Sequence, residues 1–453
     1  MEGSDARRGE GGLNAPIARA IGRPRTVVVG AGLAGLAVAR ELASRGVSVT
    51  VLDVNPEVGG LARTFRYGGW SFDVGPHRLR PDGEGVRRIV TDALGGNALS
   101  APDQPGFHAF GRTHPLPLRG SALRALPVRA MLHGAWDLVR RERVKDDSYE
   151  SEIVSAYGRT LYERLFRPAS ERFLGTPAER LDGEWARAGL ANAQREASGG
   201  AIYPRLGMGV LAERLADDTI ARGGRILLEH EVTGVEVAGN RVVSVEANGE
   251  RFGADAFVWT APVTLALRLL GALATGLHYV STVLFNVALR EPSTLGHPWV
   301  CYADERFMRV SDPTAFSPDA APEGRGALCV ECNCRKGDAL WDDPSKFVPS
   351  ILVGLALTGA MRSVRSVEAV CPERVPDSFP IYERGYREEL RGAMSSLVRY
   401  RNLVLAGRGG LFWYNRMDES IAHGLRVAAR VEEEIGQAGG TPREAANRRG
   451  VNP

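Results

Sequence analysis

Runs of β-branched residues alternate along the chain with segments whose apolar residues have the spacing of a helix. The clearest group of such segments comes first. Residues 26–29 (TVVV) are continuously apolar and end at a glycine, which predicts a fully buried strand. Residues 36–44 have the apolar spacing of a helix that ends at Gly46, and residues 48–52 form a second β-branched run. The order strand, helix, strand predicts one βαβ unit with parallel strands.

Further along, the pattern changes twice. Residues 116–174 lack strand signals and predict helices, with breaks at Pro127 and Pro168. Residues 225–262 alternate β-branched and polar positions across Gly and Asn-Gly turns, as in an antiparallel meander. Residues 277–333 form another strand-rich stretch. Helices and antiparallel strands therefore interrupt the parallel unit.

The end of the chain returns to the first pattern. Residues 402–407 (NLVLAG) predict a buried strand, and residues 418–435 predict a helix that Gly436 ends. The whole pattern predicts an α/β protein with two domains. One is a Rossmann-like domain with a central parallel sheet and a β-meander, and the other is a substrate domain of mixed sheet and helices.

Composition narrows the class of protein. With 453 residues and 44% hydrophobic content, the chain can bury a large core, and a net charge of +3 argues against a nucleic-acid partner. The longest apolar run, residues 351–361, is too short to span a bilayer, and the N-terminus lacks a signal-peptide core. Five cysteines, an odd number, favour a reducing compartment. We expect a soluble, cytoplasmic protein of open oligomeric state.

A G-x-G-x-x-G sequence lies between the first strand and the first helix. Gly30 permits the tight turn, Gly32 allows a pyrophosphate to approach the backbone, and Gly35 lets helix and strand pack closely. The exposed N–H groups at the start of the helix, at Leu33 and Ala34, would bind the pyrophosphate. This spacing predicts a dinucleotide site.

The residue at the end of the second strand supports that site. Asp53 can accept hydrogen bonds from a ribose diol. The strand, helix, second strand and acid all lie where the motif requires them. These residues by themselves are compatible with either NAD or FAD.

The residues after Asp53, NPEVGGLART, carry a resemblance to a known clan. Their Gly-Gly turn with Arg63 and Thr64 resembles the FAD-dependent clan of amine oxidases, protoporphyrinogen oxidases, phytoene desaturases and UDP-galactopyranose mutases. The resemblance implies FAD as the cofactor, with Gly60, Leu61, Arg63 and Thr64 beside its phosphates. The clan's usual ribose acid is Glu, one methylene longer than Asp53.

Later segments extend the resemblance from residue 25 to residue 435. FDVGPHRLRP resembles the segment that passes the isoalloxazine ring, HEVTGVEV the adenine strand, and the C-terminal Gly-Arg and helix the segment at the flavin edge. The helix start, with Asp418 as its N-cap, would favour the negative charge of reduced flavin. Gly407, Gly409 and Gly410 would let the backbone lie against the ring. The implied cofactor contacts are Gly75, Pro76, His77, Val232, Gly407, Arg408, Met417 and Asp418.

A narrower resemblance concerns the substrate side. GRGGLFWYNRMD resembles the UDP-galactopyranose mutase pattern, which implies substrate contacts from Arg408 and Tyr414. MRVSDPTAF resembles a second mutase segment and implies the same for Arg309. With His77, these are the candidate catalytic residues. The departures from the mutase pattern point to a different substrate, still oxygen-rich or anionic; they are Arg172, Leu174, Phe379 and Arg416.

Together these features divide the chain into seven segments. An FAD-binding domain is assembled from three of them, residues 25–100, 203–262 and 400–436. Between these lie a helical substrate or cap region (101–202) and a substrate-domain sheet (263–399). A flexible leader (1–24) and a flexible tail (437–453) are expected at the two ends.

Two functions fit these residues. The favoured one is an FAD-dependent oxidoreductase that moves hydride from a small polar substrate to flavin N5, with substrates that contain a sugar or nucleotide among the candidates. The alternative is a non-redox flavin-dependent nucleotide-sugar mutase. No lysine occurs between Lys145 and Lys336, which argues against the lysine-dependent amine oxidase mechanism.

Two other motifs are tempting but favour plainer interpretations. The CVECNC sequence at residues 329–334 has cysteine spacing that suits zinc, but no histidine is near and its cysteines fit a buried strand, so we expect no metal. Residues 122–145 form a basic amphipathic stretch with Trp136 that could lie on a membrane. Such segments more often cover a substrate cavity, so membrane contact is not expected.

Overall fold

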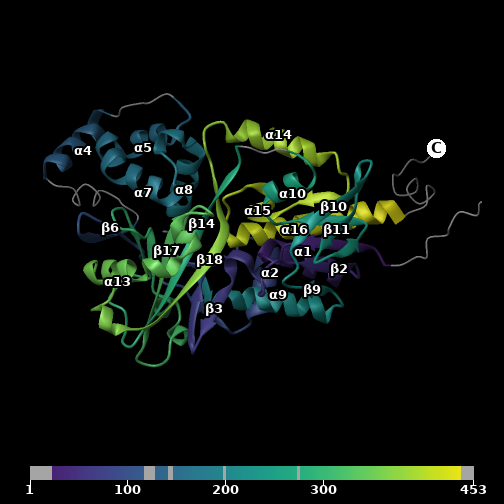
Figure 1. Ribbon diagram of the computed structural model, residues 1–453, viewed down its shortest axis with the longest axis horizontal. Helices are drawn as coiled ribbons and strands as arrows, with labels where there is room; N and C mark the ends of the chain where they lie inside the picture. Colours follow the sequence, from purple (N-terminus) through teal and green to yellow (C-terminus); the bar gives the residue numbers. More distant parts are fainter. Residues whose placement is uncertain (1–22, 117–127, 141–145, 197–199, 273–275, 440–453) are drawn as a thin grey trace, which may run out of the picture.

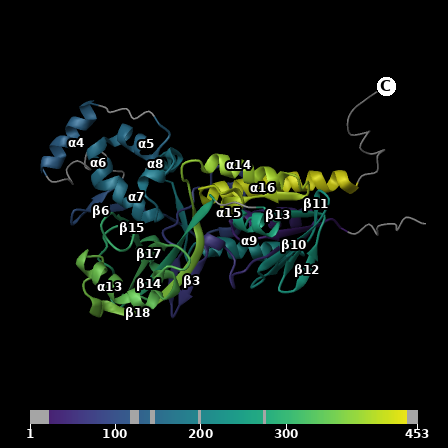
Figure 2. The ribbon, with the colours of Figure 1, turned by 45° about the horizontal axis from the view of Figure 1, so that its top comes forward.

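The structure, a computed structural model, describes residues 23–116, 128–140, 146–196, 200–272 and 276–439. Its elements form two lobes side by side (Figure 1), and the same division is visible after rotation (Figure 2). Most of the expected leader and tail, and the two ends of the basic stretch 122–145, lie outside the described residues.

A five-stranded sheet forms the centre of one lobe. Its order is β19 (Leu403–Leu405), β13 (Ala256–Trp259), β1 (Arg25–Val29), β2 (Ser48–Leu52) and β9 (Arg225–Leu227). All four pairings are parallel. Val28 packs into the core on one face of the sheet, and Val27 and Val29 pack into the core on the other. Both faces are buried, which is why β1 is continuously apolar.

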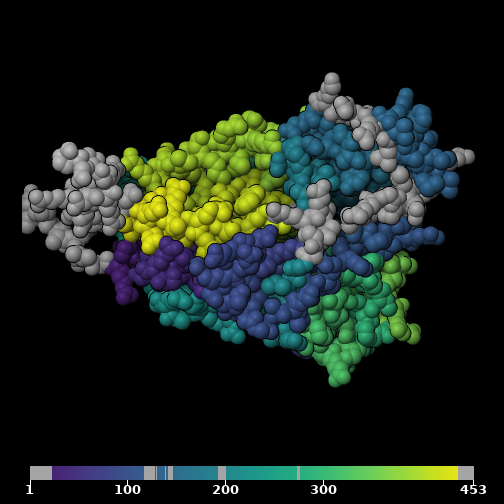
Figure 3. Space-filling model, turned by 180° about the vertical axis from the view of Figure 1, so that it is seen from behind, coloured from purple at the N-terminus to yellow at the C-terminus, as the bar shows by residue number. Residues whose placement is uncertain are grey.

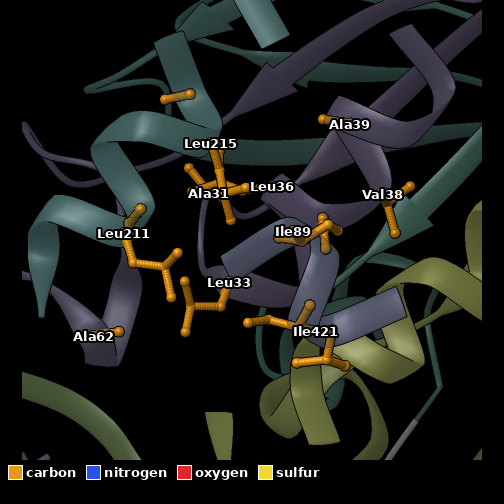
Figure 4. Packing of buried hydrophobic residues seen from close by; sticks show 14 of the residues in the cluster. Ala31, Leu33, Leu36, Val38, Ala39, Ala62, Ile89, Leu211, Leu215 and Ile421 are labelled. Carbon is orange, nitrogen blue, oxygen red and sulfur yellow. The ribbon is translucent and has the colours of Figure 1, made fainter. Parts of the chain in front are cut away.

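Four helices cover the first face of this sheet. They are α1 (Leu33–Ser44), α2 (Glu84–Leu94), α9 (Gly209–Ala221) and α16 (Met417–Gly439). Figure 4 shows Leu33 and Leu36 of α1 among Ile89 of α2, Leu211 of α9 and Ile421 of α16, all in one core. The C-terminal helix therefore completes the core that the first helix begins. Figure 3 shows this helix, in yellow, lying against the purple start of the described chain.

The second face is covered by the predicted meander and two helices. The meander consists of β10 (Val232–Ala238), β11 (Arg241–Ala247) and β12 (Glu250–Gly253), paired antiparallel. The helices are α10 (Val263–Leu269) and α14 (Tyr386–Val398). Because Tyr386 and Leu397 share a core with Val27 and Val29, α14 packs on the dinucleotide lobe, although its sequence position suggests the substrate domain.

A seven-stranded sheet forms the centre of the other lobe. Its order is β18 (Val367–Ile381), β14 (His278–Leu289), β17 (Gly326–Cys334), β16 (Arg309–Ser311), β15 (Trp299–Tyr302), β6 (Gly106–Ala109) and β7 (Arg112–Pro115). Helix α13 (Val348–Leu357) covers one face, and the hairpin of β3 (Thr64–Tyr67) and β4 (Trp70–Asp73) covers the other. The strands β6 and β7 lie within the region predicted to be helical.

Helices cap the end of this sheet. They are α4 (Val128–Arg140), α5 (Tyr149–Tyr157), α6 (Arg159–Leu161), α7 (Arg167–Leu174) and α8 (Gly183–Glu196). The break predicted at Pro168 is instead a π-helical turn at Tyr162–Phe166 that leads directly into α7. Arg167 N donates to the oxygen of Tyr162, five residues earlier, and Pro168 follows directly, at a position that has no N–H to donate.

Candidate active site

In the glycine loop between β1 and α1, two glycines are closely packed and one faces an open surface. A Cβ atom on Gly35 would lie 2.0 Å from the oxygen of Gly30, and one on Gly30 would lie 2.3 Å from Thr260 Oγ1. Gly30 also has a φ of 107°, which L side chains rarely adopt. A Cβ atom on Gly32 would meet nothing within 4 Å. Gly32 therefore faces open space beside the first N–H groups of α1, which begins at Leu33.

Asp53 follows β2 and is tied to the glycine loop. Its Oδ2 accepts a hydrogen bond from Ala31 N at 2.6 Å, and its Oδ1 accepts from Asn55 N and Nδ2 at 2.8 Å each. The residue is buried, and it lines a cavity of about 830 Å³. Because each carboxylate oxygen can accept more than one hydrogen bond, this geometry is compatible with the predicted ribose contact.

The second glycine turn lies directly against the first. A Cβ atom on Gly60 would lie 3.2 Å from the Cα of Gly32, so the two turns need small residues to approach. Arg63 follows this turn, and its Nη1 donates to Asn55 Oδ1 at 3.0 Å. Burial lowers the pKa of Arg63, an effect that the charge of Asp53 partly opposes. A cation is therefore placed beside the open glycine, where an anion can approach.

Thr64 does not share this position. Its hydroxyl donates to Asp73 Oδ1 at 2.5 Å and accepts from Gly209 N at 2.8 Å, while Tyr203 Oη donates to Asp73 Oδ2 at 2.7 Å. Burial raises the pKa of Asp73 to about 6, although these hydrogen bonds oppose the rise. Thr64 is outside the cavity lining. The resemblance implies a phosphate contact, but the structure gives its hydroxyl a packing role between β3 and α9.

One cavity of about 830 Å³ extends from the glycine loop to the seven-stranded sheet. Both glycine turns and the C-terminal segment line it, as do the four candidate catalytic residues. Of the residues predicted for the site, Gly35, Thr64, Gly75 and Gly410 are outside its lining. Segments separated by up to several hundred positions in the sequence therefore meet around one space.

The C-terminal glycines differ in what they touch. Gly407 begins the short helix α15 (Gly407–Leu411), lines the cavity, and would place a Cβ atom 2.9 Å from that of Ala34. Gly410 instead packs against β13, where its Cβ atom would lie 2.3 Å from the oxygen of Trp259. The prediction that Gly410 lies beside a ring therefore does not match the structure, whereas Gly407 and Gly409 both line the cavity.

Asp418 is not the N-cap of the last helix. Helix α16 begins at Met417, so Asp418 lies in its first turn, where it pairs with Arg416 at 2.6 Å. Glu419 accepts a hydrogen bond from Arg416 N at 2.9 Å, which is one half of a capping box. The helix therefore begins one residue before the predicted range, and it continues past Gly436, where its end was predicted, to Gly439.

Arg408 lines the substrate side of the cavity between two aromatic rings. Its guanidinium carbon lies 5.3 Å from the ring centre of Phe379 and 5.4 Å from that of Tyr414. Its side chain donates to two backbone oxygens, those of Ser378 at 3.3 Å and of Asn415. Burial lowers the pKa of Arg408, but a guanidinium stays charged in proteins. Within the described part of the chain, no carboxylate forms an ion pair with it.

Arg309 lines the same cavity but is already engaged. Its Nε and Nη2 donate to the two carboxylate oxygens of Glu331, at 2.5 and 2.7 Å. The two residues are direct cross-strand partners on β16 and β17. Burial is the largest single influence on the pKa of Arg309 and lowers it, but the charge and the hydrogen bonds of Glu331 together outweigh burial, so the pKa is raised. The Arg309 guanidinium thus forms a bidentate pair with a carboxylate of the protein itself.

His77 stays neutral in this surrounding. Burial lowers its pKa to about 3, and the charges of Arg309 and Arg408 add to the effect. Its Nδ1 has no hydrogen-bond partner within the described structure. A neutral imidazole with an unused nitrogen can hold a hydrogen bond to a bound group, but it is a weak base at neutral pH.

Several site residues were not singled out by the sequence. Glu331 lies within CVECNC, a charged residue in a buried strand, and the sequence interpretation of this motif considered only its cysteines. Lys336 and Asp377 also line the cavity and pair at 2.7 Å. Trp185 on α8 packs against Tyr414, with ring centres 5.0 Å apart. The buried acid was a usable signal, because an ionised carboxylate rarely sits in a strand core without a cation.

The cysteines of β17 lie on opposite faces of the sheet. Cys329 packs with the β3–β4 hairpin, and Cys332 and Cys334 pack beneath α13. All five cysteines of the chain are free thiols. Among the described residues, no three His, Cys, Asp or Glu side chains gather as a metal ion would require, and no helix is long and apolar enough to cross a membrane.

Residues 33–432 match the family described as flavin-containing amine oxidoreductase. The chain belongs to this family. It is therefore an enzyme of the FAD-dependent oxidoreductases, and the expectation of FAD as cofactor is confirmed. The resemblance to the amine oxidase and protoporphyrinogen oxidase clan and the two-domain α/β fold class are confirmed with it.

Individual relatives within the family act on different compounds. Phytoene dehydrogenase of Streptomyces griseus is 28% identical over 377 residues, which cover 68% of this chain and 72% of that protein. L-amino-acid oxidase of Crotalus adamanteus is 46% identical, but only over 66 residues, or 15% of this chain and 13% of that protein. These relatives are named for different substrates.

Solved structures agree on the fold. Reduced UDP-galactopyranose mutase has a TM-score of 0.78 at 19% identity, covering 90% of this chain and 96% of that one. A protein from Exiguobacterium sp. 255-15 assigned as a protoporphyrinogen oxidase has a TM-score of 0.71 at 19% identity, covering 91% and 99%. At these identities the likeness concerns the fold alone.

The residues of the cavity suit FAD. The open surface at Gly32 and the helix start beside it can take a pyrophosphate, with Arg63 as a nearby cation. Polar atoms at the other end lack partners within the described structure, among them His77 Nδ1, Asn415 Oδ1 and Arg416 Nε, and these three residues line the cavity. Buried polar atoms in native proteins normally have a partner, so they indicate a polar ligand.

Proposed function

We propose that this enzyme oxidises a C–H bond of a small, oxygen-rich substrate that carries a negative charge. The observation that supports this proposal is Arg408. Within the described residues, the Arg408 guanidinium has two backbone oxygens and two aromatic rings as partners but no ion pair, and an enclosed charge of this kind is costly unless an anion joins it. The rings of Phe379 and Tyr414 hold it in one orientation, so the anion would be received by a preformed group.

The residues that would hold the pyrophosphate and ribose of FAD lie around the glycine loop, whereas Gly407, directly before Arg408, would contact FAD on the substrate side. Gly32 and the N–H groups of Leu33 and Ala34 would contact its pyrophosphate, with Arg63 close by, and Asp53 would accept from a ribose hydroxyl. The backbone at Val232 and Gly407 would border its two ends. When bound, FAD supplies a two-electron acceptor that can take a hydride.

The chain's own residues would position the substrate. Arg408 would bind its anionic group, and Tyr414 would wall the cavity beside it. With a pKa of about 3, His77 would hold a hydrogen bond at Nδ1 rather than take a proton at neutral pH. Positioning of this kind is the main protein contribution that hydride transfer needs.

The structure also bears on the lysine argument. Strand β14, which resembles the clan strand that carries a lysine, has none. Lys336 lines the cavity, but its Nζ pairs with Asp377 Oδ2 at 2.7 Å. This arrangement supports substrate positioning by arginine rather than a lysine-dependent oxidase mechanism.

A rapid-mixing experiment tests the proposal. The FAD-loaded enzyme is mixed anaerobically with polar substrates that carry one oxidisable C–H bond and one anionic group, and the visible flavin absorbance is followed. We expect at least one such compound to bleach the oxidised flavin, and oxygen to restore the colour. Activity that requires chemically reduced enzyme and yields no oxidised product would contradict the proposal.

A second candidate is the nucleotide-sugar mutase. It is favoured by the segment from Gly407 to Asp418 and by the fold shared with UDP-galactopyranose mutase. The pairing of Arg309 argues against it, because Nε and Nη2 of Arg309 already donate to the Glu331 carboxylate and are not free to bind a diphosphate. Prior reduction of the enzyme followed by incubation with UDP-galactopyranose distinguishes the two functions.

We further propose that the enzyme works in the cytoplasm on a small molecule without a nucleic-acid partner. Five free thiols suit a reducing compartment, and a net charge of +3 is too small for broad nucleic-acid binding.

A further inference from the structure

Glu331 is a buried acid in the wall of the cavity that has no place in the function as described so far. Its side chain is only 3% exposed, and it lines the cavity next to Arg309. Replacing it would leave Arg309 and Arg408 as two guanidiniums close enough for each to lower the pKa of His77. Its position therefore determines how much positive charge faces the substrate.

The backbone is arranged to keep this carboxylate in place. Strands β16 and β17 put Arg309 directly opposite Glu331, and both carboxylate oxygens are used by the guanidinium. On the other side, a Cβ atom on Gly75 would lie 2.7 Å from Glu331 Oε1, and Gly75 has a φ of 78°. The loop that carries His77 can pass the carboxylate only because Gly75 has no side chain.

Ion pairing then follows a pattern among the cations on the substrate side of the cavity. Three cations that line the cavity pair with an acid that also lines it; these pairs are Arg309 with Glu331, Lys336 with Asp377, and Arg416 with Asp418. Arg78 and Arg80 line the cavity as well, and they pair with Asp103, which lies outside the lining. Arg408 has no such pair in the portion of the chain that the structure describes. Glu419, whose charge acts on Arg408 from a distance, is itself 3.8 Å from Arg416.

We propose that Glu331 is a specificity-determining residue that neutralises Arg309 and so limits the substrate side to one negative charge, received by Arg408. This inference rests on the proposed function and names its substrate class, a singly charged anion rather than a diphosphate. Arg309 is then a fixed component of the wall and not a second phosphate-binding fork, in contrast to what its sequence context implies.

The test compares two probes that differ in charge. Hexanoate carries one negative charge and UDP-glucose two, and their dissociation constants are measured by titration calorimetry on FAD-loaded enzyme at fixed ionic strength. Wild type should bind hexanoate. Glu331→Gln should shift the ratio of the two constants toward UDP-glucose by about tenfold or more, because a second enclosed charge becomes available.

A double variant separates charge from packing. Arg309→Met with Glu331→Leu removes a neutral pair, and apolar replacement of a buried pair is often tolerated. Its preference should stay within about threefold of wild type, since the net charge is unchanged. This variant also keeps the inference testable if Glu331→Gln fails to fold. A matched control is Glu368→Gln, which removes the same charge at a partly exposed site outside the cavity lining.

Each outcome bears on the inference. A shift in Glu331→Gln that is absent from the double variant and from the control supports it. A ratio unchanged in Glu331→Gln, a double variant that loses UDP-glucose affinity selectively, or a wild type that does not bind hexanoate would overturn it. Because binding is measured without turnover, failure here leaves hydride transfer intact, and absence of bleaching by any substrate leaves the charge selectivity intact.

Discussion

At the glycine-loop end of the cavity two backbone turns meet, whereas at the other end the wall contains several paired charged side chains. A Cβ atom on Gly60 would lie 3.2 Å from the Cα of Gly32, and helix α1 begins beside them at Leu33. Arg309 and Arg408, by contrast, reach the cavity from β16 and α15 and depend on partners from other strands. The glycine-loop end is therefore determined by local turns, and the other end by contacts between elements far apart in the sequence.

The largest expected effect is on the glycine-loop end, where a substitution would disrupt the packing of β1 against α1. Gly35→Ala would put a Cβ atom 2.0 Å from the oxygen of Gly30, and a backbone atom cannot move aside cheaply. We expect a loss of about 3 kcal/mol or more in the free energy of unfolding, as for severe overpacking. Urea unfolding of the FAD-free protein measures it; an unchanged midpoint would show that β1 and α1 pack less closely than described.

The next effect concerns the side-chain end. Arg408→Gln should lower kcat/KM by about 100-fold, because the anionic group of the substrate loses its only charged partner. Flavin content should stay near wild type. Arg408→Lys should recover little, since lysine lacks the planar group held between Phe379 and Tyr414. Arg391→Gln, an exposed change on α14, is the control for charge alone. Equal loss in the Arg408 variants and in this control would contradict a binding role.

These two ends also differ in how well the sequence predicts them. The glycine motifs and Asp53 belong to short local patterns whose geometry follows from the turns themselves; Gly30, Gly32, Gly60 and Asp53 line the cavity, and Gly35 packs against Gly30. Thr64 was misplaced because the clan pattern fixes its position but not the direction of its hydroxyl, which Asp73 and Gly209 determine. The pairing of Arg309 with Glu331 requires the register of β16 and β17, which no local pattern contains.

A smaller effect sharpens the role of the open glycine. Gly32→Ala should leave the stability of the FAD-free protein nearly unchanged, because its φ of −73° suits alanine and its Cβ atom would meet nothing within 4 Å. It should weaken FAD binding by about tenfold, since a methyl group would stand where the pyrophosphate approaches. Titration of FAD-free protein with FAD measures this. Equal affinity would place the pyrophosphate elsewhere.

The smallest effect concerns His77 and pH. Its pKa falls from 6.5 in the unfolded chain to about 3 in the folded protein, so only the unfolded chain gains the proton between these values. Folded stability should therefore decrease as pH falls from 6.5 toward 3, by at most about 1.4 kcal/mol per pH unit. His77→Asn should flatten this dependence in urea unfolding of FAD-free protein. Parallel curves for both proteins would show that His77 is well solvated.

The most direct test of substrate oxidation guided by Arg408 is anaerobic reduction of the wild-type enzyme by a singly charged, oxidisable substrate. We predict that the visible flavin absorbance bleaches without any added reductant and that Arg408→Gln, equally loaded with FAD, bleaches far more slowly. A flavin that stays oxidised with every such compound, while reduced enzyme rearranges a nucleotide sugar, would contradict hydride transfer as the function of this enzyme.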